Sequence, residues 1–213
     1  MIVSREKLAL WLITILVIGL ALGYLFSSRF CRVSINKRVV KITRLNQELR
    51  RLLVHHTVWT YHYLQSRYLS YEDQEAAAEQ LAKNDDEFGA LFASYYGQST
   101  YPELIVLLQT QKNNLDQAFE ELTSGNPHTV DFKKTERELS NYLQQLKVLP
   151  IDALEFSQIF ISTMSTNFIE IIKAWNSKNW QKAFALYENN LEISRESADL
   201  LDRLIAEEFP YKF

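Results

Sequence analysis

Residues 52–64 read LLVHHTVWTYHYL and place three histidines beside a tryptophan and two tyrosines. Imidazole nitrogens bind metal ions and transfer protons near neutral pH, so this stretch is the first place to look for chemistry. The spacing argues against a metal site made by these histidines alone. On a helix, His55 and His62 share a face but lie about 10.5 Å apart along the axis, and His55 and His56 diverge by about 100°. A metal ion would need ligands from other segments.

The common catalytic and cofactor motifs are missing from the sequence. It contains no Glu-x-x-His, no His-Glu-x-x-His, no glycine-rich phosphate loop and no Gly-x-Ser-x-Gly. Cys31 is the only cysteine, which excludes an intrachain disulfide and a zinc site built on cysteines. A nucleophile pair of Cys31 with His55 fails too, because a helix would hold them roughly 36 Å apart. We therefore predict no catalytic residue, no metal and no cofactor, and we favour a protein that is not an enzyme over one that is.

Polar side chains at positions that the apolar periodicity turns inward form a second set of candidates. Buried polar groups need hydrogen-bond partners, and groups at a similar depth on different helices could share one network. Such a network could be a polar layer that fixes the register of the helices, which we favour, or a small-ligand pocket around His56. The ligand-binding candidates are His56, Thr60, Tyr63, Asn84, Tyr95, Gln111, Thr163 and Asn167.

Long helices must position these residues. The chain has 213 residues, 47% of them hydrophobic, with only five glycines and four prolines, a composition typical of one helical domain with an appendage. Apolar residues recur every three or four positions, which is the helical period. The seams predict helices over about residues 37–69, 70–97, 102–123, 132–146, 152–175 and 180–208. Short turns between them predict an all-α, up-down antiparallel helical bundle.

The helical period also assigns faces within these helices. In the first helix, His56, Trp59 and Tyr63 should face the core, with His55 and His62 at its margin or in solvent. The predicted inward seam of the fifth helix is Phe156, Phe160, Thr163 and Asn167. The predicted inward seam of the last helix is Trp180, Phe184, Tyr187, Leu191, Ser194, Ala198, Leu201 and Ile205.

Helix-start signals add predictions about where helices begin. Ser70 with Asp73 resembles a capping pair for the second helix, and Asp152 with Glu155 resembles a capping box for the fifth. Asn84 is followed by three acidic residues and resembles an N-cap, so the second helix could break there.

An uncharged apolar run, Leu8 to Phe26, precedes the bundle. Its nineteen residues would span about 28 Å as a helix, close to the ~30 Å hydrocarbon core of a bilayer. Trp11 and Tyr24 lie near its ends, where aromatic rings favour the membrane interface. The sequence therefore predicts a single transmembrane anchor that includes Leu8, Trp11, Tyr24 and Phe26.

A cleaved signal peptide is the competing interpretation of this run. Arg5 and Lys7 resemble the basic start of such a peptide, and Ala21, Leu22 and Gly23 offer small residues for cleavage. The run is long for a signal peptide, and the positive charge beyond it would hinder export. We favour the uncleaved anchor.

Basic residues follow the apolar run. Residues 29–51 hold eight basic residues against Glu48 alone, whereas residues 52–213 hold 13 basic and 24 acidic ones. By the positive-inside rule this cluster places the soluble domain in the cytoplasm, although the short N-terminal tail leaves the opposite orientation open. The cluster could also bind anionic lipid headgroups, or it could be the topology signal alone. The headgroup candidates are Arg29, Arg32, Lys37 and Arg38, and Cys31 among them could be palmitoylated or remain a free thiol.

Charge and hydropathy thus divide the chain into three parts. Residues 1–28 form the tail and transmembrane helix, residues 29–51 a basic juxtamembrane helix segment, and residues 52–213 an acidic helical bundle domain. An acidic domain argues against nucleic-acid binding, which needs a basic face. We expect a single-pass protein of the cell membrane.

Four short motifs occur along residues 52–213. They are His56-Thr57-Val58-Trp59-Thr60, Leu81-Ala82-Lys83-Asn84 followed by Asp86-Glu87-Phe88-Gly89, Tyr95-Tyr96-Gly97, and Glu208-Phe209-Pro210-Tyr211-Lys212-Phe213. They resemble the signatures of a group of small helical proteins of bacteria and some large viruses. That family carries His-x-x-Trp-Thr-Arg, Arg-Leu-Leu-x-Asn, Tyr-Tyr-Gly and Gln-Phe-Pro-x-Lys-Phe in the same order. The resemblance implies a helical bundle and brings no established activity.

The departures from the family pattern concern its histidines. Family members tend to carry a histidine in the third helix and another in the fifth, and the matching positions here are Gln111 and Thr163. Tyr61 stands where the family has an arginine after Trp-Thr. If the family binds something through converging histidines, this chain keeps only His56, which argues against a metal or redox role here.

These observations lead to two hypotheses about function. The first is a membrane-anchored helical bundle, not an enzyme, that presents an acidic surface to protein partners. The second is a bundle, with or without enzymatic activity, that binds a small-molecule ligand or a metal at a site centred on His56, Gln111 and Thr163.

Overall fold

The computed structural model of the chain describes residues 38–213, which form helices joined by short connections. A helix covers residues 38–69 and is named the N-terminal helix here. It is followed by α2 (Gln74–Tyr96), the 3-10 turn η1 (Gln98–Thr100), α3 (Tyr101–Thr123), α4 (Phe132–Gln145), α5 (Pro150–Ser157), the π-helical segment η2 (Gln158–Thr163), α6 (Met164–Asn176), α7 (Trp180–Glu208) and the 3-10 turn η3 (Pro210–Lys212). Residues 38–213 contain no strand. The prediction of an all-α bundle is confirmed.

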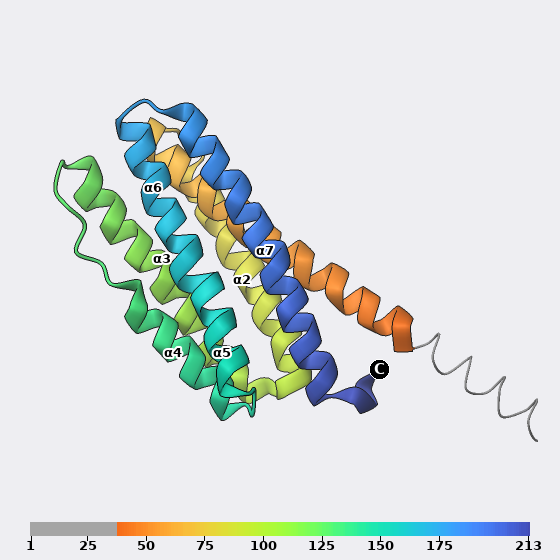
Figure 1. The fold of residues 1–213 in the computed structure, drawn as a ribbon. Helices are drawn as coiled ribbons and strands as arrows, with labels where there is room; N and C mark the ends of the chain where they lie inside the picture. The colour runs from red at the N-terminus through yellow and green to blue at the C-terminus, as the bar shows by residue number, and fades with distance from the viewer. Residues whose placement is uncertain (1–37) are drawn as a thin grey trace, which may run out of the picture. The chain divides into compact units, whose positions relative to one another are not determined.

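The chain divides into two units, residues 1–43 with Phe213 and residues 44–212. In the first unit, residues 38–43 are helical. The second unit is the bundle, in which successive long helices run in alternating directions (Figure 1). Within it, α6 packs against both α3 and α7, and α4 packs against α3 and α5. Helix α6 is correspondingly apolar, and Phe168, Ile171 and Ile172 have no exposed surface.

The predicted helix starts hold for α3 but fail for α2. Helix α3 begins at Tyr101 with Pro102 in its first turn, as the proline predicts. Helix α2 begins at Gln74, and the Asp73 side chain before it makes no capping hydrogen bond. Ser70 lies in the preceding turn with a φ of 55°, in the left-handed region. Ser70 therefore belongs to a turn that needs a left-handed residue, and the predicted capping pair of Ser70 and Asp73 does not form.

Two further helix-start predictions are wrong. Helix α2 continues without a break through Asn84, whose side-chain amide donates to the carbonyl of Leu52 at 3.0 Å instead of capping a helix. Helix α5 begins at Pro150, so that Asp152 lies inside the first turn and forms no capping box with Glu155. Proline fixes its φ near the helical value and lacks an N–H, which makes it a natural first-turn residue.

The π-helical segment η2 changes which residues of the fifth predicted helix face the core. A π turn holds more residues than an α turn, so side chains after it point in different directions from those that an α-helical period predicts. The buried positions include Phe156 and Phe160, as predicted, and also Ile161, Met164 and Phe168. Thr163 is exposed, and its hydroxyl donates to the carbonyl of Gln158, while Asn167 is half-buried. The predicted inward position of Thr163 is therefore wrong, and that of Asn167 holds only in part.

The predicted inward seam of α7 holds in the second half of the helix and fails in the first. Ser194, Ala198, Leu201 and Ile205 are buried, as predicted. Trp180 and Phe184 are 52% and 57% exposed, and the core side of that half is formed by residues such as Ala183 and Asn190.

None of the helices within residues 38–213 is long and apolar enough to cross a membrane. The predicted anchor, Leu8 to Phe26, lies outside the described residues, as do Arg29, Cys31, Arg32 and Lys37. Arg38 is described, and it is exposed.

Candidate functional site

The candidate His56 forms a buried hydrogen bond with Asp85. His56, on the N-terminal helix, is 5% exposed, and Asp85, on α2, is 6% exposed. Asp85 Oδ1 lies 2.7 Å from His56 Nδ1. The ring of Phe160, from η2, packs against the imidazole with 5.3 Å between ring centroids. Asp85 therefore fixes the orientation of the imidazole. The acidic character of residues 85–87 was the one signal of this pairing in the sequence.

A carboxylate-oriented imidazole is the arrangement that a general base needs, so the surroundings of the pair decide whether it can do chemistry. Within residues 38–213, no hydrogen bond joins His56 to a serine, threonine or cysteine nucleophile. The same residues contain no group of three or more histidine, cysteine or acidic side chains able to hold a metal ion. The described contacts of His56 are those of a packed core residue.

Asn84 and Gln111 are buried as predicted, but each binds a different backbone carbonyl. Asn84 donates to Leu52, as described above. Gln111 Nε2 donates to the carbonyl of Phe160 at 3.3 Å and to Ser165 Oγ at 3.1 Å. The first of these bonds satisfies a carbonyl inside the π-helical segment. Asn84 Oδ1 and Gln111 Oε1 have no hydrogen-bond partner among the described residues.

The hydroxyl-bearing candidates lie in three separate places. Thr60 is buried, and its hydroxyl has no partner within residues 38–213. Tyr63 lies under Lys112, whose Nζ is 4.5 Å from the ring centroid and 3.4 Å from the phenol oxygen, and burial raises the pKa of Tyr63. Tyr95 is half-buried near the end of α2, where burial also raises its pKa.

Asn167 belongs to a polar network that the sequence did not reveal. Its amide donates to Asn190 Oδ1 at 2.8 Å, and Asn190 in turn donates to the carbonyl of Met164. Thr57 Oγ1 lies 2.6 Å from Ser194 Oγ, and Ser194 donates to the carbonyl of Asn190. The network joins the N-terminal helix, α6 and α7. The eight predicted residues therefore do not converge on one site.

The four sequence motifs meet in the fold as two pairs. The first two motifs contact each other's neighbouring residues: His56 binds Asp85, which lies between the two parts of the second motif, and Asn84 donates to the carbonyl of Leu52, four residues before His56. The Tyr95-Tyr96-Gly97 motif contacts the C-terminal motif, where Lys212 Nζ donates to the carbonyls of Ser94 and Tyr95 at 2.8 and 3.0 Å.

The second pair of motifs closes the end of α2. A lysine at the last carbonyls of a helix satisfies them and interacts favourably with the helix dipole. Gly97 follows with a φ of 104°, which favours glycine. The Tyr96 ring packs edge-on against Phe209 with 4.9 Å between ring centroids. Tyr96, Gly97 and Lys212 therefore have structural roles at the end of α2.

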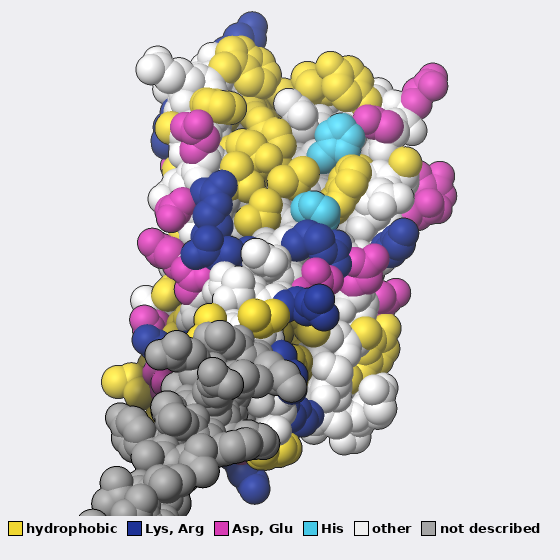
Figure 2. All heavy atoms as spheres, turned by 90° about the vertical axis from the view of Figure 1, so that its right-hand side faces the viewer, with side chains coloured by type: hydrophobic (Ala, Val, Ile, Leu, Met, Phe, Trp, Pro, Cys, Tyr) yellow, Lys and Arg dark blue, Asp and Glu magenta, His cyan; other side chains and the backbone are white. Residues whose placement is uncertain are grey.

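An aromatic surface lies on the N-terminal helix and the first half of α7. The aromatic patch consists of Tyr61, Tyr68, Trp180, Phe184 and Tyr187. Tyr61 stacks on Tyr187 with 4.2 Å between centroids, and Tyr68 meets Trp180 edge-on at 6.4 Å. Beneath them, the buried Trp175 contacts both Tyr61 and Tyr68. Hydrophobic side chains gather in the upper half of the face in Figure 2, above a band of Lys and Arg side chains.

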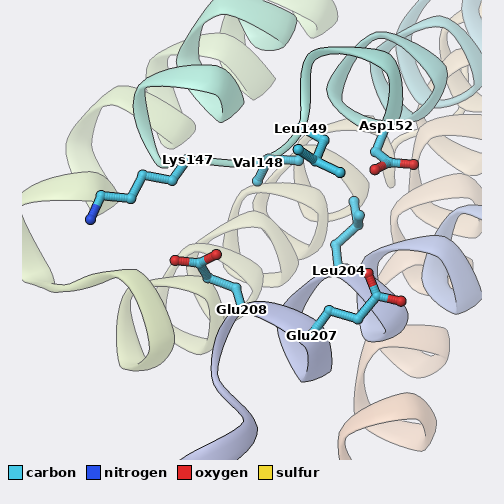
Figure 3. A pocket seen from close by; sticks show the side chains of 7 residues that line it. All are labelled: Lys147, Val148, Leu149, Asp152, Leu204, Glu207 and Glu208. Carbon is cyan, nitrogen blue, oxygen red and sulfur yellow. The ribbon is translucent and has the colours of Figure 1, made fainter.

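A small cleft lies between the start of α5 and the end of α7 (Figure 3). Its volume is about 170 Å³. It is lined by Lys147, Val148, Leu149, Asp152, Leu204, Glu207 and Glu208. In Figure 3 the Lys147 side chain points away from the carboxylates, which come from both helices. Three of its four charged lining side chains are acidic, and none of these four is buried.

Comparison of the chain with protein-family models, with curated proteins and with solved structures found no match. The family resemblance described above rests on its four motifs alone.

Proposed function

We propose that the protein is a membrane-anchored helical bundle, not an enzyme, that docks a protein partner through the aromatic patch. The observation that carries the proposal is the exposure of Trp180 and Phe184. The two residues lie one turn apart in the first half of α7. The apolar stripe to which they belong is buried in the second half of α7 and exposed in the first half, among the described residues.

Aromatic side chains of this kind are typical of interface centres. Tyrosine and tryptophan are enriched among the residues that contribute most to binding, because they bury a large area at a low cost in conformational entropy. Tyr68 contacts the exposed Trp180, and the buried Trp175 packs beneath Tyr61 and Tyr68. A partner would meet a preorganised surface.

Charge indicates what the partner should carry. Residues 52–213 contain 24 acidic and 13 basic residues, so the field of the domain attracts a basic surface. We therefore propose a partner segment with an apolar centre and a basic rim. The uncharged run Leu8 to Phe26 and the basic residues after it support the membrane attachment of this module, with the bundle on the cytoplasmic side.

The alternative, a ligand site centred on His56, Gln111 and Thr163, has less support. His56 is paired with Asp85 and covered by Phe160, Gln111 binds a backbone carbonyl and Ser165, and Thr163 lies on the surface.

Affinity capture with the full-length chain in a mild detergent tests the proposal. The variant Trp180→Ala/Phe184→Ala should capture at least about tenfold less partner than the wild type, since truncation of a central aromatic residue costs roughly 2 kcal/mol or more of binding free energy. Val106→Ala is the matched control, because Val106 is 58% exposed on α3 outside the patch. The partner captured by the wild type should carry a basic segment. Binding of that segment should protect Trp180 from chemical modification.

Three results would count against the proposal. The wild type could capture no defined partner, the double variant could retain the partner as well as the control does, or the purified protein could turn over a small molecule.

A further inference from the structure

A second cleft, with a volume of about 210 Å³, lies between the N-terminal helix and α2. Its residues are Arg51, His55 and Trp59 on one helix and Gln80, Lys83, Asn84 and Glu87 on the other. The spacing of four on the first helix, and of three and four on the second, puts each set on one helix face. The cleft therefore has two opposed walls.

One end of the cleft is closed by an ion-pair network. Arg51 binds Glu48 at 2.7 Å on its own helix and Glu87 at 2.8 Å across the cleft. These two carboxylates raise the pKa of Arg51, whose charge is already balanced by them. Arg51 and Glu87 thus form a rigid wall and leave the recognition of a ligand to the other residues.

The middle of the cleft contains two nitrogen groups that the bundle does not use. Lys83 forms no hydrogen bond or ion pair within residues 38–213, and neither does His55, although His55 is close enough to Glu48 to lower the pKa of that carboxyl. Both side chains are exposed, so an anion can reach them without rearrangement of the fold.

The rest of the cleft offers an apolar surface and amide groups. The half-buried Trp59 supplies an indole ring, and Gln80 on the opposite wall supplies an exposed amide. Asn84 is only 5% exposed, and its Oδ1 lacks a partner among the described residues.

We propose that this cleft binds a small organic oxyanion, in which a phosphate or carboxylate group carries a flat apolar substituent. The anionic group lies between His55 and Lys83, and the flat substituent stacks on Trp59 next to Gln80. The site is independent of the aromatic patch, because the two share no residue.

Calorimetric titration of the full-length chain in mild detergent with phenyl phosphate tests this site. Phenyl phosphate should bind more tightly than inorganic phosphate, which lacks the ring, and much more tightly than phenol, which lacks the charge. Lys83→Gln and His55→Gln should each weaken its binding by about tenfold, as expected for the loss of one charge-assisted hydrogen bond. Trp59→Leu should abolish the preference for phenyl phosphate over inorganic phosphate.

Lys134→Gln is the control, because Lys134 is an exposed lysine of α4 outside the cleft. Thermal unfolding of Lys83→Gln, His55→Gln and Lys134→Gln should match the wild type, because all three residues are exposed, and this separates loss of binding from loss of fold. The inference is overturned if phenyl phosphate does not bind at millimolar concentration, if phenol binds equally well, or if Lys83→Gln and His55→Gln bind as the control does. If phenyl phosphate binds as expected, a benzoate titration distinguishes a phosphate site from a carboxylate site. Tighter binding of benzoate than of phenyl phosphate would assign the site to carboxylates.

Discussion

The buried pair of His56 and Asp85 should contribute strongly to stability as a unit. Removing one member leaves the other without its hydrogen-bond partner in the core, which costs roughly 1–3 kcal/mol, and more when the remaining group is charged. We expect His56→Ala and Asp85→Ala each to lower the free energy of unfolding by about 2–3 kcal/mol. Because both variants remove the same interaction, the double variant should lose clearly less than the sum of the two.

Urea unfolding followed by circular dichroism measures these differences. Strictly additive losses would show that the two side chains act separately. If the wild type carries a bound ligand, and His56→Ala loses that ligand without losing stability, His56 belongs to a binding site and not to a structural pair.

At the residue scale, the sequence predicted burial better than it predicted partners. It placed His56, Asn84 and Gln111 in the core correctly, because the helical period reports which face of a helix is apolar. It missed Asp85, Thr57, Ser194 and Asn190 as partners. Pairing across the bundle depends on the relative register of helices that are far apart in sequence, and no local pattern reports that register.

The packing of α2 against α3 depends on a close approach at Gly89. A Cβ added there would lie 2.9 Å from Ile105 Cδ1 and 3.0 Å from two atoms of the Tyr101 ring. Alanine favours a helix over glycine by about 1 kcal/mol, but overpacking a core contact costs about 1–3 kcal/mol. We expect Gly89→Ala to lower the free energy of unfolding by about 1 kcal/mol or more.

Glu79→Ala provides the control for helix propensity, since Glu79 is an exposed residue of α2. The two variants can be compared by thermal unfolding. A Gly89→Ala variant that is more stable than the wild type would show that Ile105 and Tyr101 adjust at little cost.

At the element scale, helix existence was predictable and local geometry was not. Pro102 marks the first turn of α3, because proline suits that position, whereas the fifth helix was predicted to begin at Asp152 and begins at Pro150. The π-helical segment η2 was not predictable, since residues 158–163 carry no proline or glycine that would signal an irregular turn. That one irregular turn accounts for the wrong position of Thr163.

The whole bundle should lose stability in alkaline solution through its buried tyrosines. Tyr142 is 2% exposed and donates to the carbonyl of Thr100 at 2.8 Å, and burial raises its pKa to about 12. Burial also raises the pKa of Tyr96. A tyrosine with a raised pKa in the folded state favours folding fully below about pH 10, the ordinary value, and that advantage is lost as the pH rises toward the folded value.

We therefore expect the free energy of unfolding to fall between about pH 10 and 12, with Tyr142 accounting for roughly 2–3 kcal/mol of the loss. Tyr142→Phe should be less stable at neutral pH, because the bond to Thr100 is gone, and should show a shallower alkaline decline. Urea unfolding over this pH range, with tyrosinate absorbance as a second signal, tests the expectation. Equal slopes for variant and wild type would assign the decline to other groups.

At the scale of the molecule, the sequence predicted a helical bundle but did not predict its open surfaces. The stripe on α7 predicted burial for Trp180 and Phe184, because an apolar period does not distinguish a core contact from a docking surface. Both proposed binding surfaces arise from what the folded helices leave uncovered among the described residues.

The π-helical segment also matters for how this chain is compared with others. A helix that contains one wide turn is out of step by about one residue with a regular helix of the same fold. A relative that lacks this turn would align correctly only if a single-residue gap were opened between positions 158 and 163. Without that gap, its core residues after the turn would be matched to solvent-facing residues here, and two similar bundles would look unrelated.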